Sequence, residues 1–228
     1  MTSLKQYFNR RLTVRETALV VAAALALAGL GYVAYNLVAA QILEARVKAA
    51  MPQVCAAIRE QRRILLSALE AYKAHFGVYP PDHVVGRQPL VIDPVNNPLL
   101  YELVGVIYNS TNKTLELGSL EPADAKFVKE FFHCDGFKNC AQSNDQVKRF
   151  LTTDPLPARQ LHDDPDVFVL GFNVPYEGLA PEVVWAFTVS SWRYVSTSPT
   201  HNPGQFDLWI EVKTRSQSMT LGNWQAAD

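Results

Sequence analysis

The sequence lacks any strong excess of charge of one sign. Its 21 lysines and arginines nearly balance 22 aspartates and glutamates, and the formal net charge at pH 7 is −1. No long basic or acidic run interrupts this balance, so nothing in the composition indicates nucleic-acid binding. The 228 residues suffice for a membrane anchor and one compact domain of 150 or more residues with its own core.

The sequence also lacks catalytic motifs. It contains no nucleophile elbow, zinc-binding helix, phosphate loop or dinucleotide glycine pattern. The densest polar cluster, His162–Asp166, has three carboxylates and one histidine; it fits a cation site or, more often, a solvated loop before a strand. His75, His83 and His201 lie far apart beside turn residues, as surface histidines do. We therefore predict a protein that is not an enzyme, with no metal, cofactor or small-molecule substrate.

Charge is entirely missing between Thr17 and Leu43. A helix needs roughly 20 apolar residues to cross the hydrocarbon core, so residues 17–43 are predicted to form a transmembrane helix. The positively charged residues before it place residues 1–16 in the cytoplasm as a short tail and residues 44–228 outside the cytoplasmic membrane. These residues are Lys5, Arg10, Arg11 and Arg15.

A cleaved secretory signal is the alternative interpretation of this segment. Signal peptides have an apolar core of about 7–15 residues, shorter than the present run. Small residues at Ala39 and Ala40 nevertheless keep a cleavage site open. The length favours a retained single-pass anchor in the cytoplasmic membrane, with membrane lipid as its first partner.

An amphipathic helical pattern follows the anchor and runs to about Gly77, where Pro80 and Pro81 prevent continuation. Its apolar residues recur at the spacing of three and four that is typical of one buried helix face: Val47, Met51, Val54, Ile58, Leu65, Leu69, Tyr72 and Phe76. Its charged residues are expected to face water: Arg46, Lys48, Arg59, Glu60, Arg62, Arg63, Glu70 and Lys73. Pro52 is expected to kink this helix or mark a restart, since proline removes a backbone donor.

The carboxy-terminal part of the sequence changes to β-branched and aromatic runs separated by Pro, Gly and Asn. We predict strands at 167–172, 183–189, 192–195 and 206–212, forming an antiparallel sheet packed across the amphipathic helix. Phe206, Leu208 and Ile210 are expected to be buried, while Asp207, Trp209 and Glu211 face mostly water. The fold class is therefore α+β, with a long amino-terminal helix.

The middle of the chain carries weaker signals. Residues 82–96 are predicted to be a loop, and residues 106–117 a hairpin around Asn109–Asn112. A helix is expected over 119–132, capped by Ser119 or Glu121, and a second short helix over 143–150. These two helices define an inserted segment at about 119–152, whose role the sequence does not indicate.

Two of the three cysteines, Cys134 and Cys140, lie close together between these helices. In an oxidising compartment they are expected to form a disulfide; free thiols are the next alternative, and a metal site with His133 is disfavoured because further ligands are missing. Cys55 is interpreted as a small packing residue of the amphipathic helix.

Several short motifs, in their order and spacing, resemble those of the type II secretion system pseudopilins and the wider type IV pilin-like family. The helix end Ala68-Leu-Glu-Ala-Tyr-Lys-Ala-His-Phe-Gly-Val-Tyr-Pro80 is followed by a short helix at 97–103, by Phe206-Asp-Leu-Trp209 and by Asn223-Trp224. The resemblance is closest to the major pseudopilin and covers residues 12–105 and 165–225. It implies a pilin-like fold and assembly with other pilin-like subunits and secretion or pilus machinery.

The match at the processing site is incomplete. Leu12, Thr13 and Glu16 fit the start of a processed family member, and the resemblance implies that Glu16 registers subunits in a filament. Arg11, however, stands where the family has glycine before the prepilin peptidase cut. The calcium-binding loop of the family's major subunit is not carried over, because Lys213–Met219 has no carboxylate and two positive charges.

Two functions follow from the resemblance and its departures. The first is a structural subunit or accessory component of a type II secretion pseudopilus or type IV pilus-like filament. The alternative is a membrane-tethered extracytoplasmic binding or scaffold protein that never assembles, and Arg11 favours this alternative.

Overall fold

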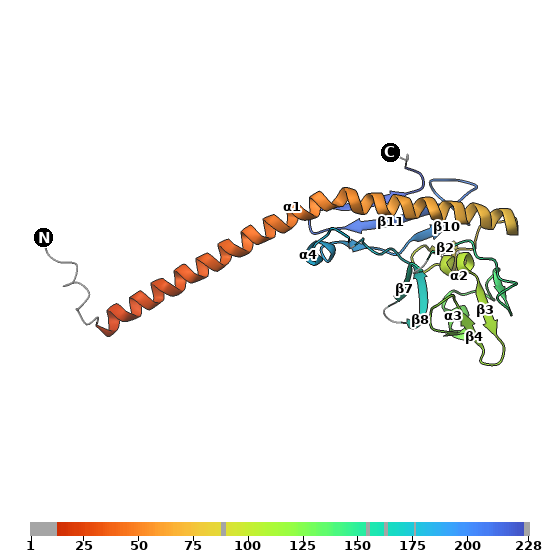
Figure 1. Cartoon of the computed structure of the whole chain (residues 1–228), viewed down its shortest axis with the longest axis horizontal. Coiled ribbons are helices and arrows are strands. Elements are labelled where there is room, and N and C mark those ends of the chain that lie inside the picture. The colour runs from red at the N-terminus through yellow and green to blue at the C-terminus, as the bar shows by residue number, and fades with distance from the viewer. Residues whose placement is uncertain (1–12, 88–89, 154–155, 162–163, 176, 226–228) are drawn as a thin grey trace. The chain divides into compact units, whose positions relative to one another are not determined.

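The computed structural model describes residues 13–87, 90–153, 156–161, 164–175 and 177–225. The chain divides into two compact units, Met1–Lys48 and Ala49–Asp228, and each is described by itself. All strands lie in the second unit, so the α+β class that the sequence predicts is confirmed (Figure 1).

Helix α1 extends from Val14 to Phe76 and continues through Pro52 without interruption. The prediction that the helix restarts at Pro52 is therefore wrong. The helix ends where the sequence predicts: Gly77 has φ 77°, in the left-handed region, and its N–H donates to the carbonyl of Lys73 at 2.8 Å. Glycine adopts this conformation without a steric penalty, which explains the position of the end.

Within the second unit, one face of α1 is buried at the predicted spacing. Val54, Ile58, Leu65, Leu69 and Tyr72 are fully buried. Arg62 departs from the prediction that it faces water, because it is only 7% exposed. Its Nη1 donates to the carbonyl of Gly222 at 2.5 Å, so the charged head has a partner while its stem packs.

The sheet that contacts this helix is centred on β11 (Asp207–Lys213). Strand β12 (Ser218–Gly222) pairs with β11, as do β10 (Arg193–Val195) and the short β9 (Thr188–Val189), and all pairings are antiparallel. Side chains link the sheet region to the helix: Trp192 Nε1 donates to Gln61 Oε1 at 2.8 Å. The predicted packing of an antiparallel sheet on the amphipathic helix is confirmed.

The predicted strands at 167–172 and 183–189 do not join this sheet as whole strands. Strand β8 (Asp164–Leu170) pairs with β7 (Ala158–Leu161) in a separate two-stranded sheet. The start of the second run forms a short helix, α4 (Pro181–Val184), because Pro181 suits a first helical position, and only its end becomes β9.

Residues 82–96 are not the loop that the sequence predicts. Strands β1 (His83–Arg87) and β2 (Leu90–Asp93) form an antiparallel pair with an irregular register between Val84 and Gly86. The following helix α2 (Leu99–Val104) agrees with the prediction, and all six of its residues are buried.

Two short strands of the inserted segment join the hairpin that precedes it in a small sheet with the order β5-β4-β3-β6. The predicted hairpin is confirmed as β3 (Val106–Asn109) and β4 (Thr114–Glu116), and β6 (Cys140–Ala141) is parallel to β3. Strand β5 (Ala123–Asp124) leads into helix α3 (Ala125–Phe131), shorter than the predicted helix. Its cap is Asp124, whose Oδ1 accepts from the N–H of Phe127 at 2.8 Å, and not Ser119 or Glu121.

The helix predicted over 143–150 is absent, for a visible reason. The side chain of Asn139 binds the backbone of Lys148 twice: its Nδ2 donates to the Lys148 carbonyl at 2.6 Å, and its Oδ1 accepts from the Lys148 N–H at 3.1 Å. The N–H groups of Phe150 and Leu151 both donate to the carbonyl of Leu103. These partners replace the bonds that a helix would use.

Candidate functional site

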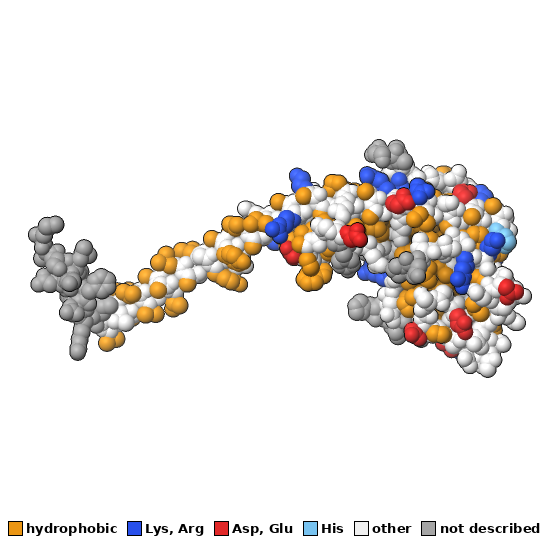
Figure 2. All heavy atoms as spheres, viewed as in Figure 1, with side chains coloured by type: hydrophobic (Ala, Val, Ile, Leu, Met, Phe, Trp, Pro, Cys, Tyr) orange, Lys and Arg blue, Asp and Glu red, His pale blue; other side chains and the backbone are white. Residues whose placement is uncertain are grey.

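The apolar part of α1 exposes large hydrophobic side chains, which require apolar surroundings. Its large side chains are uncovered: Leu25, Leu27 and Leu30 are 69%, 70% and 68% exposed. Figure 2 shows hydrophobic side chains along this segment, without blue or red between them. The helix is long and apolar enough to cross a membrane.

Burial of each such leucine is worth roughly 1.5–3 kcal/mol. Soluble proteins rarely expose a continuous apolar surface of this kind, which marks contact with a membrane or with another protein. A methyl group added at Gly29 or Gly31 would meet nothing within 4 Å, so a neighbouring helix has room to approach there.

Two residues of the processing-like motif are described: Thr13 directly precedes α1, and Glu16 lies in its first turn. The N–H and Oγ1 of Thr13 donate to Oε2 of Glu16 at 2.8 and 2.9 Å, and Oγ1 of Thr13 accepts from the Glu16 N–H at 3.3 Å. This reciprocal arrangement is a capping box. The bond from the Thr13 backbone, followed by the hydroxyl bond, lowers the pKa of the Glu16 carboxyl.

Both of these bonds end on Oε2 of Glu16, and among the described residues no group donates a hydrogen bond to Oε1. The carboxylate is therefore ionised, oriented by its own helix, and able to accept from a group of another chain. Arg11 and Leu12, the other residues of the predicted motif, lie outside the described residues.

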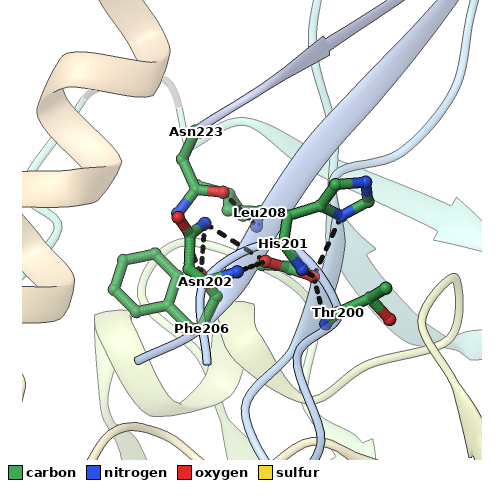
Figure 3. A network of polar contacts seen from close by, with 7 residues as sticks. Thr200, His201, Asn202, Phe206, Leu208 and Asn223 are labelled. Carbon is green, nitrogen blue, oxygen red and sulfur yellow. Dashed lines mark hydrogen bonds and ion pairs between the residues drawn. The ribbon is translucent and has the colours of Figure 1, made fainter. Parts of the chain in front are cut away.

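A second polar centre lies where the sequence predicts a water-facing residue. Asp207 begins β11, but its side chain is only 4% exposed. Oδ2 accepts from the backbone N–H groups of Thr200 and His201 at 2.7 and 2.9 Å, and Oδ1 accepts from the N–H and Nδ2 of Asn202 at 3.0 and 3.1 Å. Figure 3 shows these donors converging on one carboxylate.

Burial alone would raise the pKa of the Asp207 carboxyl, but the bonds from His201, Thr200 and Asn202 outweigh it and lower that pKa. Nδ1 of His201 lies 3.2 Å from Oδ2, and the imidazole stacks on Trp224 with 3.8 Å between ring centroids. The carboxylate oxygens are thus directed at N–H donors, the opposite of what a cation site requires. The Asp207 cluster closes a loop and does not suit metal binding.

The segment Lys213–Met219, which corresponds to the calcium-binding loop of the major pseudopilin in the resemblance, contains a tight turn between β11 and β12. Thr214 N–H donates to the carbonyl of Gln217 at 2.8 Å, and the Gln217 N–H donates to Oγ1 of Thr214 at 3.1 Å. In the described ranges, no group of three or more His, Cys, Asp or Glu side chains is arranged to hold a metal ion.

A third polar centre, not anticipated from the sequence, is the fully buried Glu102 of α2. Its carboxylate accepts from Tyr72 Oη at 2.8 Å and from the N–H groups of Lys138 and Asn139 at 2.9 and 3.0 Å. Desolvation by burial raises the pKa of the Glu102 carboxyl against these bonds. Glu102 joins α1, α2 and the inserted region through one side chain.

The predicted disulfide is not formed. Cys134 and Cys140 are free thiols, as is the buried Cys55. The two cysteines are held by different elements: the Cys134 N–H donates to the carbonyl of Lys129 in α3 at 3.0 Å, whereas Cys140 belongs to β6 and pairs with Val106 of β3. Burial is the main cause that raises the pKa of both thiols, which disfavours the reactive thiolate.

The other polar candidates do not assemble into a catalytic group. His162 and Asp163 lie outside the described residues, while Asp164 and Asp166 belong to β8. His201 is engaged by Asp207, and His75 packs its ring near Phe76 at 4.6 Å between centroids. His83 is not a surface residue as predicted but is 3% exposed, and its Nε2 lies 2.8 Å from Nδ1 of His133.

Sequence reasoning missed Glu102 and His83 because their partners are distant in the chain. It missed Asp207 because the partners of this carboxylate are backbone N–H groups of an irregular loop, which no residue pattern marks. One signal existed for Glu102, which is a lone carboxylate within the otherwise apolar run Leu99–Val104. Comparison with family models, with curated proteins and with solved structures finds no match to this chain.

Proposed function

We propose that this protein is a pilin-like structural subunit or accessory component of a type II secretion pseudopilus or a type IV pilus-like filament. Its amino terminus lies in the cytoplasm, its apolar helix in the bacterial inner membrane, and its carboxy-terminal unit in the periplasm. It acts without a catalytic site, through contact with other pilin-like subunits and secretion or pilus machinery.

The observation that supports this proposal most strongly is the change of surroundings along α1. The helix begins with apolar side chains that nothing covers, and its last part has an apolar face buried by the antiparallel sheet of the second unit. A subunit that is first stored in a membrane and then transferred to a bundle of like helices needs such a segment, because both environments are apolar.

Glu16 gives a second, local support. Its carboxylate lies at the start of the apolar segment, ionised and oriented by Thr13, with Oε1 free of hydrogen bonds from the described part of the chain. If the chain is cut before Leu12, the new amine of a neighbouring subunit can pair with this carboxylate. A buried pair of this kind fixes register, since an unpaired charge in an apolar bundle is costly.

Intact-mass measurement of the amino terminus is the first test. A chain that begins with an N-methylated Leu12 supports assembly, whereas an intact Met1 supports the alternative of a tether that does not assemble. Arg11 in the position of the family's glycine is the specific feature that favours this alternative.

Affinity purification after in-cell crosslinking is the second test, with Glu16→Gln as the informative variant. The proposal expects co-purification of other pilin-like or secretion components with the wild type and less of them with the variant. Recovery of the wild type only as a dispersed monomer contradicts the proposal.

A further inference from the structure

His133 has a backbone conformation that is uncommon among residues other than glycine. Its φ is 49°, in the left-handed region that favours glycine. It directly follows the last turn of α3, where its N–H donates to the carbonyl of Glu130 at 3.2 Å and the next N–H, of Cys134, donates to the carbonyl of Lys129 at 3.0 Å. This is the Schellman arrangement that usually ends in glycine or asparagine. A histidine here therefore calls for a reason in its side chain.

The side chain of His133 makes its hydrogen bond to another imidazole. Its Nδ1 lies 2.8 Å from Nε2 of His83 on β1, and the two rings are stacked with 5.1 Å between centroids and 21° between planes. His83 is 3% exposed, and its Nδ1 lies 2.6 Å from the carbonyl oxygen of Asn96. The histidine pair connects the β1–β2 hairpin to the end of α3.

The carbonyl of Asn96 determines how the protons are placed. A carbonyl only accepts, so Nδ1 of His83 carries a proton and donates to it. In neutral His83, Nε2 is then an acceptor, and the bond between the rings requires the proton on Nδ1 of His133. One added proton on Nε2 of His133 keeps this bond, because Nδ1–H still donates. A second added proton, on Nε2 of His83, places two donors against each other at 2.8 Å.

We propose that the His83–His133 pair is an acid-sensitive latch, which holds the β1–β2 hairpin to the inserted region and opens when both imidazoles are protonated. The inference does not depend on filament assembly. It assigns to the extracytoplasmic unit a response to the acidity of its surroundings.

The groups around His83 set the direction of the pH response. Burial is the main cause that lowers the pKa of His83, and the neighbouring His133 also lowers it; the carbonyl of Asn96 and the carboxylates of Asp93 and Asp82 act in the opposite direction.

The two carboxylates near His83 are largely occupied by other donors: Asp82 accepts from Ser196 and Thr197, and Asp93 from Val95 and Asn96. The rings of Phe131 and Phe132, with centroids 6.3 and 6.0 Å away, offer no solvation to a charge.

These surroundings determine whether acid favours the closed or the open state of the pair. The closed state holds His83 with a lowered pKa, so it binds fewer protons than the open state as the pH falls below the ordinary histidine value. Acid therefore favours the open state. The latch is fully closed above about pH 6.5 and loosens progressively below it.

Hydrogen–deuterium exchange of the full-length chain in lipid nanodiscs, corrected for intrinsic exchange at each pH, measures this opening. For peptides covering His83–Arg87 and residues 130–137, the opening equilibrium should rise by up to about tenfold for each pH unit below about 6.5. A peptide covering β11 is the internal reference and should stay protected. Equal protection of the latch peptides from pH 7.5 to pH 5 overturns the proposal.

Two substitutions at the same position separate the latch from a general loss of stability. His133→Asn keeps a residue that tolerates the left-handed conformation, and its amide places a donor or an acceptor where Nδ1 stands, without a charge. Its latch peptides should lose most of the acid response. His133→Gly suits the backbone best but removes the ring, so exchange should already be high at pH 7.5. An undiminished acid response in His133→Asn, or a closed hairpin in His133→Gly, contradicts the latch.

Discussion

At the scale of single residues, the second unit depends on a few buried carboxylates whose partners are mostly backbone N–H groups. Asp207 is the clearest case, because one side chain satisfies the N–H groups of three consecutive residues, Thr200–Asn202. Asp82 repeats the arrangement with the N–H groups of Ser196 and Thr197. Such residues fix the path of loops that no regular strand holds.

Asp207→Asn should destabilise the second unit strongly. In the variant, an amide NH2 group would face N–H groups that donate to a carboxylate oxygen in the wild type. The negative charge that strengthens the remaining hydrogen bonds would also be lost. We expect a loss of roughly 2–4 kcal/mol in the free energy of unfolding, measured by chemical denaturation in detergent. Asp135→Asn, at an exposed position, is the matched control and should change little. An equal effect of the two substitutions would show that the Asp207 cluster does not hold the loop.

Glu102 is expected to make the second unit less stable as the pH rises, which is opposite in sign to the pH dependence of the His83–His133 pair. Its folded-state pKa is raised, mainly by burial, so the folded chain binds more protons than the unfolded chain above the ordinary glutamate value. Its contribution to stability is therefore lost as the pH rises above about 4.3. Glu102→Gln removes this titration, so its stability relative to wild type should improve between pH 4.5 and pH 7.5.

The improvement should amount to about 1.4 kcal/mol for each unit by which the pKa of Glu102 is raised. Chemical denaturation of wild type and variant at both pH values gives this difference directly. A stability difference that is independent of pH would show that Glu102 titrates alike in the folded and unfolded chain.

At the scale of elements, local sequence signals succeeded where the structure follows local rules. The position of the α1 end follows from Gly77, the buried face of α1 from spacing, and the β3–β4 hairpin from its turn residues. Predictions failed where a distant partner decides the outcome. The sequence around Arg62 does not indicate that the carbonyl of Gly222 is its partner, and the sequence of 143–150 does not indicate that Phe150 donates to the carbonyl of Leu103.

Asn139 supplies a prediction at this scale, because its side chain determines the conformation of a whole segment. Besides Lys148, its Nδ2 donates to the carbonyl of Glu102 at 2.8 Å. Asn139→Ala should release residues 140–150 and cost roughly 2–3 kcal/mol through buried groups left without partners. Limited proteolysis should then cut this segment faster than in wild type. Asn144→Ala, which removes only an exposed bond from Arg149, is the control and should be cut like wild type.

At the scale of the whole molecule, the two units differ in how their apolar side chains are covered. The second unit buries its apolar side chains within itself, as the fully buried Leu65, Leu208 and Ile210 show. The apolar segment of α1 has no such cover from the described residues. The sequence predicted this division from the missing charges between Thr17 and Leu43, because a membrane span depends on composition and length and not on tertiary partners.

The double substitution Leu25→Arg with Leu30→Arg tests this division. Each arginine near the centre of a span costs about 2.5–3.5 kcal/mol of insertion free energy, so together they should remove most of the chain from the membrane. Flotation on a sucrose gradient, followed by alkaline extraction, separates inserted chains from aggregates. Leu25→Ile with Leu30→Ile keeps the hydrophobicity and should float like wild type. Because the second unit has its own core, a protease-resistant fragment of it should persist in the arginine variant. Loss of that fragment would mean that folding of the second unit depends on membrane insertion. Undiminished flotation of the arginine variant would mean that this segment does not anchor the protein in the membrane.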